Sequence, residues 1–293
     1  LMECFWEGFL AVLPIIIVSY VVGLGIEFAV AQMRGHEVNE GFLVSGMLIP
    51  LVVPADIPLW MVAVATAFAV IFGKEVFGGT GMNIWNPALI ARAFLFFAYP
   101  SKISGDTVWY SNCVDGFTGP TALSLAGTGD YTTYSIMDCI IGNIPGSIGE
   151  TSVIAIGLGA ILLLVTGIAS WKTMFSVIAG GAIMGWVFNN FGAADNAMAM
   201  LPWYQHLIIG GFAFGAVFMA TDPVTSPRTE CAKYIYGFLI GAMAIIIRVL
   251  NPGYPEGMML AILLMNTLAP LFDYFVIQKN ISKRKNRVKT AKA

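Results

Sequence analysis

The sequence has few charged residues for its length. Charged side chains make up 11% of its 293 residues, whereas hydrophobic side chains make up 58%, and the mean hydropathy is +0.79. A water-soluble domain of this size has too small an interior to hide that much apolar surface. The scarcity of charge therefore excludes a soluble globular protein and indicates a chain that crosses a membrane several times.

Cysteine and histidine are also scarce. The two histidines are isolated, and the spacing of the cysteines is not that of metal ligands, so we expect no metal centre held by this chain alone. Two of the cysteines share one polar segment and could form a disulfide. The four cysteines are Cys4, Cys113, Cys139 and Cys231, and the pair in question is Cys113 with Cys139.

Basic residues are concentrated at one end of the chain. Seven of the 15 Lys and Arg residues lie between Lys279 and Lys292. Such a tail is more typical of the cytoplasmic end of a membrane protein than of a nucleic-acid site. We therefore predict a basic cytoplasmic tail over 279–293 and no nucleic-acid partner.

Nine apolar segments can be drawn along the chain. Two of them, 41–54 and 86–100, are shorter than the stretch of about 20 residues that a straight spanning helix needs. They read as half-helices or broken spans, which membranes tolerate where protein buries them. The full set is 5–33, 41–54, 59–77, 86–100, 151–170, 171–191, 204–221, 231–250 and 256–278.

The order of these segments predicts an inverted repeat. Four precede the polar segment 101–150 and five follow it, and the chain begins at Leu1 rather than Met. One further helix before Leu1 would give two halves of five helices, and an odd number per half inverts the second half. Two interruptions of similar composition, Phe77–Pro87 and Phe218–Pro227, support the repeat.

We therefore predict an all-α polytopic membrane protein, an inverted-repeat (5+5) helical bundle with broken half-helices whose first helix is missing from this chain. The domains expected are a first repeat over 1–100, an extracytoplasmic loop over 101–150, a second repeat over 151–278 and the tail. With the tail in the cytoplasm, most of the remaining basic residues fall on the same side, and the loop 101–150 falls outside. These basic residues are Arg34, Lys74, Lys172, Arg228 and Lys233.

The loop contains the most informative motif of the chain. Asp115–Thr121 has the form D-x-x-T-G-x-T, which resembles the sequence at which a flavin transferase joins FMN to a threonine through a phosphoester. Glycines at 116 and 119 give such a segment the freedom that a modifying enzyme requires. The motif predicts a covalent FMN on Thr121 within a site that includes Asp115, Thr118 and Gly119. The alternative is an ordinary Gly/Pro loop.

Further motifs stand in a fixed order around this loop, and with it they identify a family. Nearly the whole chain resembles NqrB, a membrane subunit of the sodium-translocating NADH:quinone oxidoreductases. RnfD, from the related Rnf complex, shares the loop and Thr221-Asp222-Pro223, and is the alternative. The motifs are Lys74–Gly81, Asn86–Leu89, Ile144–Glu150, Met219–Val224 and Asn251–Gly257.

The resemblance implies the cofactors and partners. It implies a multi-pass subunit of the bacterial inner membrane that carries covalent FMN and noncovalent riboflavin and passes electrons to ubiquinone or menaquinone while Na⁺ is transported. Its partners would be the flavin-bearing and iron–sulfur subunits of one complex. One departure concerns Pro120, which stands where the family usually has alanine. Proline fixes φ and lacks an N–H donor, which bears on the efficiency of flavin attachment.

Riboflavin is assigned to the segment Gly78–Pro87. Its glycines permit close approach to a ring, and Asn83 and Asn86 offer donors and acceptors. The alternative is that this segment only interrupts a discontinuous helix.

Four acids within or beside apolar segments are candidates for the sodium path, because buried acids commonly line an ion pathway or pair with a cation. They are Glu27, Glu75, Asp222 and Asp273. The alternatives are capping for Asp222 and a structural pair of Glu75 with Lys74 or Arg92. For quinone, the resemblance points to Gly23 and Gly25, although glycines of this kind also serve helix packing.

Two functions from different classes remain. The first is electron transfer through bound flavins. The second is a cofactor-free solute or ion channel on the same inverted repeat, since a fold alone does not define a function. The flavin-attachment motif separates the two, because a channel has no need for it.

Overall fold

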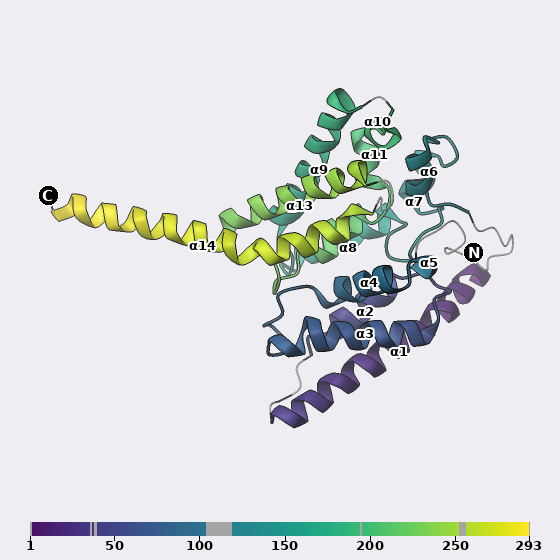
Figure 1. Ribbon diagram of the computed structural model, residues 1–293, viewed down its shortest axis with the longest axis horizontal. Helices are drawn as coiled ribbons and strands as arrows, with labels where there is room; N and C mark the ends of the chain where they lie inside the picture. Colours follow the sequence, from purple (N-terminus) through teal and green to yellow (C-terminus); the bar gives the residue numbers. More distant parts are fainter. Residues whose placement is uncertain are drawn as a thin grey trace.

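The structure is a computed structural model that describes residues 2–35, 37, 40–103, 119–193, 195–251 and 256–292. Asp115, Thr118 and Cys113 lie outside these residues. Every regular element of the described part is a helix (Figure 1). Five of them are long and apolar enough to cross a membrane, which confirms the all-α polytopic architecture: Gly8–Arg34, Leu59–Phe77, Trp171–Phe191, Glu230–Leu250 and Gly257–Arg287.

The first half contains two long and two short helices. Both short helices are those that the sequence predicts, 10 residues in α2 and 12 in α4. A glycine-rich turn after α3 begins with a short 3₁₀ helix, η1. The elements are α1 (Met2–Arg34), α2 (Phe42–Leu51), α3 (Leu59–Gly73), η1 (Glu75–Phe77) and α4 (Pro87–Ala98).

The joint and the second half are more broken than expected. Segment 151–170 forms a helix of only 13 residues, α8, and segment 204–221 divides into two short helices and a π-helix, η2. Gly210, with φ of +70°, lies at this break. The elements are α5 (Pro100–Ile103), α6 (Ala122–Thr128), α7 (Ile136–Ile141), α8 (Val153–Val165), α9 (Trp171–Phe191), α10 (Ala197–Met200), α11 (Trp203–Ile208), α12 (Phe212–Phe214), η2 (Gly215–Met219), α13 (Glu230–Leu250) and α14 (Gly257–Lys292).

Within each half, the helices pack against one another in the same order. In the first half α1 packs on α2 and α3, α3 packs on α4, and α2 packs on α4; in the second, α9 packs on α11 and α13, α13 on α14, and η2 on α14. Such a correspondence is what a repeated unit produces. The counterpart of α3 is thus α13, and that of α2 is the broken segment α11 to η2.

This correspondence changes how the two polar interruptions are related. The segment 74–86 joins α3 to α4, whereas 220–229 joins η2 to α13, so the two are not counterparts in the repeat as their composition suggested. They meet in space instead, because the side-chain amide of Asn86 donates a hydrogen bond to Asp222 at 3.3 Å.

Glycines bring α9 and α13 into backbone contact. A methyl group at Gly241 would lie 2.0 Å from the carbonyl oxygen of Val177, and one at Gly180 would lie 2.2 Å from that of Phe238. Small residues at a helix interface allow this approach inside a membrane, where packing replaces the hydrophobic effect as the main attraction. The second half is therefore built around this contact.

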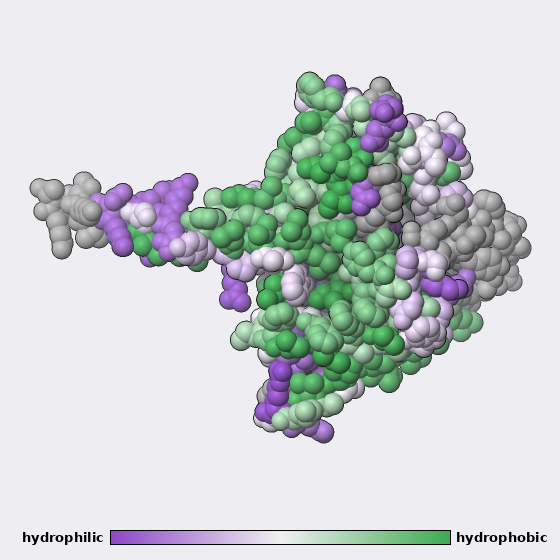
Figure 2. All heavy atoms as spheres, in the orientation of Figure 1, coloured by the Kyte–Doolittle hydropathy of each residue, from purple (hydrophilic) through white to green (hydrophobic). Residues whose placement is uncertain are grey.

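The molecule has two polar ends with an apolar body between them. Hydrophobic residues cover most of the body, and hydrophilic residues gather on the projecting end of α14 (Figure 2). We call the end from which 279–292 project the tail end. The opposite end, which carries α6 and α7, is the loop end (Figure 1). Thr121 lies at the loop end, because it directly precedes α6.

Candidate functional site

A cavity of about 310 Å³ lies where the two halves meet on the tail side. Its walls come from α2, the connections 74–86 and 220–229, and the residues after α8. We call it the tail-side cavity. It brings Asp222 together with two predicted site residues that are far from it in the sequence, Asn83 and Asn86.

Asn86 holds the start of α4 and one wall of this cavity. Its side-chain oxygen accepts a hydrogen bond from the Ala88 N–H at 2.9 Å, and Pro87 occupies the first helical position, as Asn-Pro predicts. The side-chain amide of the same residue reaches Asp222. Because Asn86 is buried, this polar side chain fixes the boundary between the two halves.

Asp222 shapes the turn that follows η2. Its carboxylate accepts hydrogen bonds from the Val224 N–H at 3.0 Å and the Thr225 hydroxyl at 3.1 Å, besides the one from Asn86. The local capping expected as the alternative is therefore present. The same residue also lines the cavity wall.

The remaining walls combine a few polar groups with apolar ones. The Asn83 amide donates to the Trp85 carbonyl at 3.1 Å, and Thr80 and Ser45 add hydroxyl groups, while Leu48 and Phe218 are apolar. Ligand sites of about 300–1,000 Å³ typically show this composition, apolar walls with few convergent polar groups. The donor set fits a flat heteroaromatic ring with carbonyl and N–H groups on its edge.

Two predicted acids lie near this cavity in ion pairs. Glu27 of α1 pairs with Lys74, and both side chains are 4% exposed. Glu75 is also buried, and its carboxylate lies 3.8 Å from the Arg34 guanidinium. The alternative pairs of Glu75 with Lys74 or Arg92 are wrong, because Lys74 turns to Glu27 and Arg92 has other partners.

Asp273 is placed elsewhere, at the start of α13. It accepts hydrogen bonds from the Arg228 and Thr229 N–H groups, each at 2.9 Å, and from the Thr229 hydroxyl at 2.6 Å. Since α13 has no cap from its own N-cap side chain, Asp273 of α14 supplies it. This acid does not line the tail-side cavity.

The two glycines assigned to quinone face different surroundings. A methyl group at Gly23 would lie 1.9 Å from the ring of Phe42, so this position serves the packing of α1 on α2. Gly25 has nothing within 4 Å of the corresponding point and is exposed. Of the two, only Gly25 leaves room beside α1.

Thr121 is the N-cap of α6. Its hydroxyl oxygen accepts a hydrogen bond from the Ser124 N–H at 3.1 Å, and its backbone is extended, with φ of −65° and ψ of 154°. The side chain is half-buried, and Gly119, two residues before it, is buried. The predicted attachment residue therefore has a hydroxyl held in one direction at the loop end.

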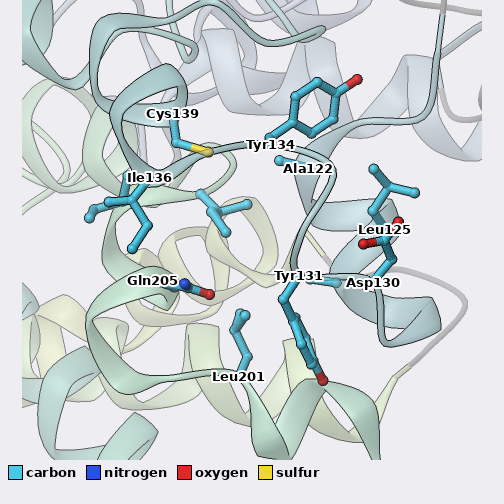
Figure 3. A pocket seen from close by; sticks show the side chains of 12 residues that line it. Ala122, Leu125, Asp130, Tyr131, Tyr134, Ile136, Cys139, Leu201 and Gln205 are labelled. Carbon is cyan, nitrogen blue, oxygen red and sulfur yellow. The ribbon is translucent and has the colours of Figure 1, made fainter.

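A small pocket lies beside Thr121, lined by Ala122, Tyr131, Tyr134, Cys139 and Gln205 (Figure 3). The Tyr134 hydroxyl donates to the Pro120 carbonyl at 3.3 Å, and that of Tyr131 donates to the Ala197 carbonyl at 2.5 Å. Burial raises the pKa of the Cys139 thiol, so it is not a reactive thiolate. At about 20 Å³ the pocket holds roughly one water molecule rather than a ring.

A buried charge cluster near the loop end was not identified from the sequence. Arg92 of α4 pairs with Glu150 and Glu256, and its guanidinium donates to Glu150 at 3.3 Å. These three side chains line a cavity to which Arg248 of α13 also contributes. Arg248 donates to the carbonyls of His206 and Ile209, at 2.7 and 3.2 Å, where α11 ends. A charged residue inside an apolar segment is the signal that would have found it.

These features define the class: an α-helical polytopic membrane protein with a repeated helix order and a largely apolar cavity, carrying a few polar groups, where the connections 74–86 and 220–229 meet. The particular family follows from the comparison of the whole chain. The model of the NQR2, RnfD, RnfE family matches residues 1–282, and the chain belongs to this family.

Three relatives are similar over most of their length, and each is named as the B component of a Na(+)-translocating NADH-quinone reductase. The protein from Pseudomonas aeruginosa strain LESB58 is 50% identical over 97% of this chain and 71% of its own. That from Chromohalobacter salexigens is 53% identical over 94% and 67%, respectively. That from Pseudoalteromonas atlantica is 53% identical over 94% and 69%.

Proposed function

We propose that this chain is the electron-carrying membrane subunit of a Na⁺-translocating NADH-quinone reductase in a bacterial inner membrane. The names of its relatives favour this function over that of an Rnf-type subunit. The observation that carries the flavin part is the tail-side cavity, which gathers Asn83, Asn86 and Asp222 at the opposite end of the bundle from Thr121. Two cofactor positions on opposite sides provide a route for an electron across the membrane.

The first position is Thr121, which would hold FMN as a phosphoester. The Ser124 N–H donates to the hydroxyl oxygen, so the hydroxyl hydrogen points elsewhere and the oxygen is held in one orientation. As an ester this oxygen still has a lone pair for the cap. Attachment on the extracytoplasmic side fits the placement of the loop end opposite the basic tail (Figure 1).

The second position is the tail-side cavity, which would hold riboflavin without a covalent bond. Bound there, the flavin would accept and donate single electrons, and the protein would bind and orient it. The Asn83 amide oxygen faces no donor within its turn and is available to the ring edge, whereas Asn86 is largely engaged by α4 and Asp222. Asn83 is therefore the stronger candidate for direct contact.

Sodium and quinone complete the proposal. Three of the predicted acids lie on the tail side around the cavity, where carboxylate oxygens suit a hard cation: Glu27, Glu75 and Asp222. The fourth, Asp273, belongs to α14 and does not line the cavity. Quinone would approach α1 at Gly25, whose surroundings are open, while Gly23 is covered by Phe42. The other subunits of the complex would supply electrons to the flavin on Thr121.

The decisive experiment is a denaturing gel viewed under ultraviolet light, with the protein made in a host that has the flavin transferase. The wild-type band should fluoresce. Thr121→Val should be dark while still inserting in the membrane, whereas Thr128→Val, which removes a hydroxyl at the other end of α6, should remain fluorescent.

Acid extraction of the folded protein then tests the second cofactor. It should release riboflavin from wild type and from Thr121→Val alike. A dark wild-type band together with an extract free of flavin would contradict the electron-transfer function and favour the cofactor-free channel.

A further inference from the structure

Lys74 is the one basic residue among the described residues that line the tail-side cavity. It directly follows α3, where its backbone N–H donates to the Val70 carbonyl at 3.2 Å, and its side chain contacts Glu27 of α1 and Phe42 of α2. The ammonium lies 5.8 Å from the centre of the Phe42 ring and is paired with Glu27. A positive charge is thus buried at the wall of the proposed riboflavin site.

The two members of this pair stand in different relations to the cavity. Lys74 lines it, whereas Glu27 belongs to α1 and does not. The acid that lines the cavity is Asp222, whose carboxylate is held by Asn86, Val224 and Thr225. A negative charge that develops in the cavity is therefore attracted by the Lys74 ammonium. The ion pair with Glu27 partly neutralises this ammonium and weakens the attraction.

We propose that the Lys74–Glu27 pair sets the reduction potential of the flavin in the tail-side cavity, with Lys74 favouring reduction and Glu27 opposing it. This inference rests on the proposed function, because it requires a flavin in the cavity. Reduction adds one electron to the bound group, and nearby charges act strongly on that electron because the surroundings are of low polarity. Lys74 lines the cavity and Glu27 does not, so the effect of the ammonium should exceed that of the Glu27 carboxylate.

Two single substitutions should act in opposite directions. Lys74→Met keeps the length of the side chain and removes its charge, so the ratio of reduced to oxidised flavin at a fixed potential should fall about tenfold, which is about 59 mV for a one-electron step. Glu27→Gln leaves the ammonium uncompensated, so that ratio should rise, by less. The double variant should return toward wild type.

The measurement is a redox titration of flavin absorbance in the purified complex, in a Thr121→Val background that lacks the covalent flavin of this chain. Flavins of the other subunits serve as an internal reference, since their potentials should not move. Lys74→Arg keeps the charge and should stay close to wild type. If the Lys74–Glu27 pair only holds α1 against α3, the riboflavin potential should be unchanged in Lys74→Met and in Glu27→Gln, or both variants should lose flavin alike.

The outcomes separate the two proposals. Riboflavin that is absent from the wild-type extract overturns the proposed function. Riboflavin that is present, with shifts of the same sign in both single variants or no shift in either, overturns the role of the pair and leaves the proposed function standing. Lys74→Met leaves Glu27 buried without its cation, which can destabilise the fold. Glu27→Gln avoids this problem and tests the inference alone. An unchanged or lowered reduction potential of the riboflavin in Glu27→Gln contradicts the inference.

Discussion

Replacing Arg92 by methionine should destabilise the protein strongly. Arg92 is 5% exposed and pairs with two carboxylates, Glu150, which is 7% exposed, and Glu256, which is 27% exposed. Methionine fills most of the space of the arginine stem but leaves both carboxylates without their cation. Breaking a buried ion pair in this way costs about 3–5 kcal/mol.

The structure places Arg92→Met at the lower end of that range. Glu256 is partly exposed, and Arg248 lines the cavity that Arg92, Glu150 and Glu256 share, so both features reduce the cost of the unpaired charge. We expect about 3 kcal/mol, a shift of more than 100-fold in the unfolding equilibrium, since 1.4 kcal/mol is about tenfold. Reversible unfolding in lipid bicelles, followed by trapping of the separated halves with a bulky binding partner, measures this free energy.

The matched control is Lys172→Met, which breaks a second ion pair by the same substitution. Lys172 and Glu230 are 26% and 61% exposed, and pairs of this kind contribute only about 0–1 kcal/mol. A triple variant with Arg92→Met, Glu150→Gln and Glu256→Gln should recover most of the lost stability, because no buried charge is left unpaired. Equal effects of Arg92→Met and Lys172→Met would refute the reasoning.

Three other changes test separate parts of the structure. Gly241→Ala should push α9 from α13 and lower stability by about 1–3 kcal/mol in the same unfolding assay, whereas Gly157→Ala, with nothing within 4 Å, should change it little. Asn86→Ala should lower the free energy of unfolding by about 1 kcal/mol, because α4 loses its cap, and should reduce the amount of extractable riboflavin. An unchanged amount of riboflavin would show that the hydrogen bond from Asn86 to Asp222 does not shape the cavity. Asp273→Asn should raise the sodium concentration for half-maximal quinone reduction, with Asp138→Asn in α7 as the control, and an unchanged requirement would count against Asp273 in the sodium path.

The helical plan could be predicted from hydropathy because each apolar segment reports on itself. The short lengths of α2 and α4 followed from the positions of Pro, Gly and polar residues at their ends. The division of 204–221 did not, since its apolar residues continue across the break and only Gly210 and Gly211 mark it. Composition also matched the wrong interruptions, because helix contacts, which sequence does not display, define the counterparts in a repeat.

The site was predictable in its members but not in its pairings. Asn83, Asn86 and Asp222 were named individually, and the fold brings them to one cavity. The partners of the charged groups were not foreseen, because Arg92 lies 58 residues from Glu150 and 164 from Glu256. Nothing local in the sequence indicates which acid a buried arginine will meet after folding.

The contact between Asn86 and Asp222 has a mechanical consequence. On the tail side the halves are joined by hydrogen bonds of this kind, at 3.3 Å here and at 2.9 Å between Trp85 and Thr267, whereas near the loop end Arg92 of the first half grips Glu256 of the second through opposite charges. The Trp85–Thr267 bond joins two neutral groups and the Asn86–Asp222 bond has one charged partner, whereas Arg92 and Glu256 are both charged. Hydrogen bonds are stronger when their partners are ionised. The contacts between the halves are therefore weaker on the tail side than near the loop end. A force that pulls the halves apart would separate them first on the tail side.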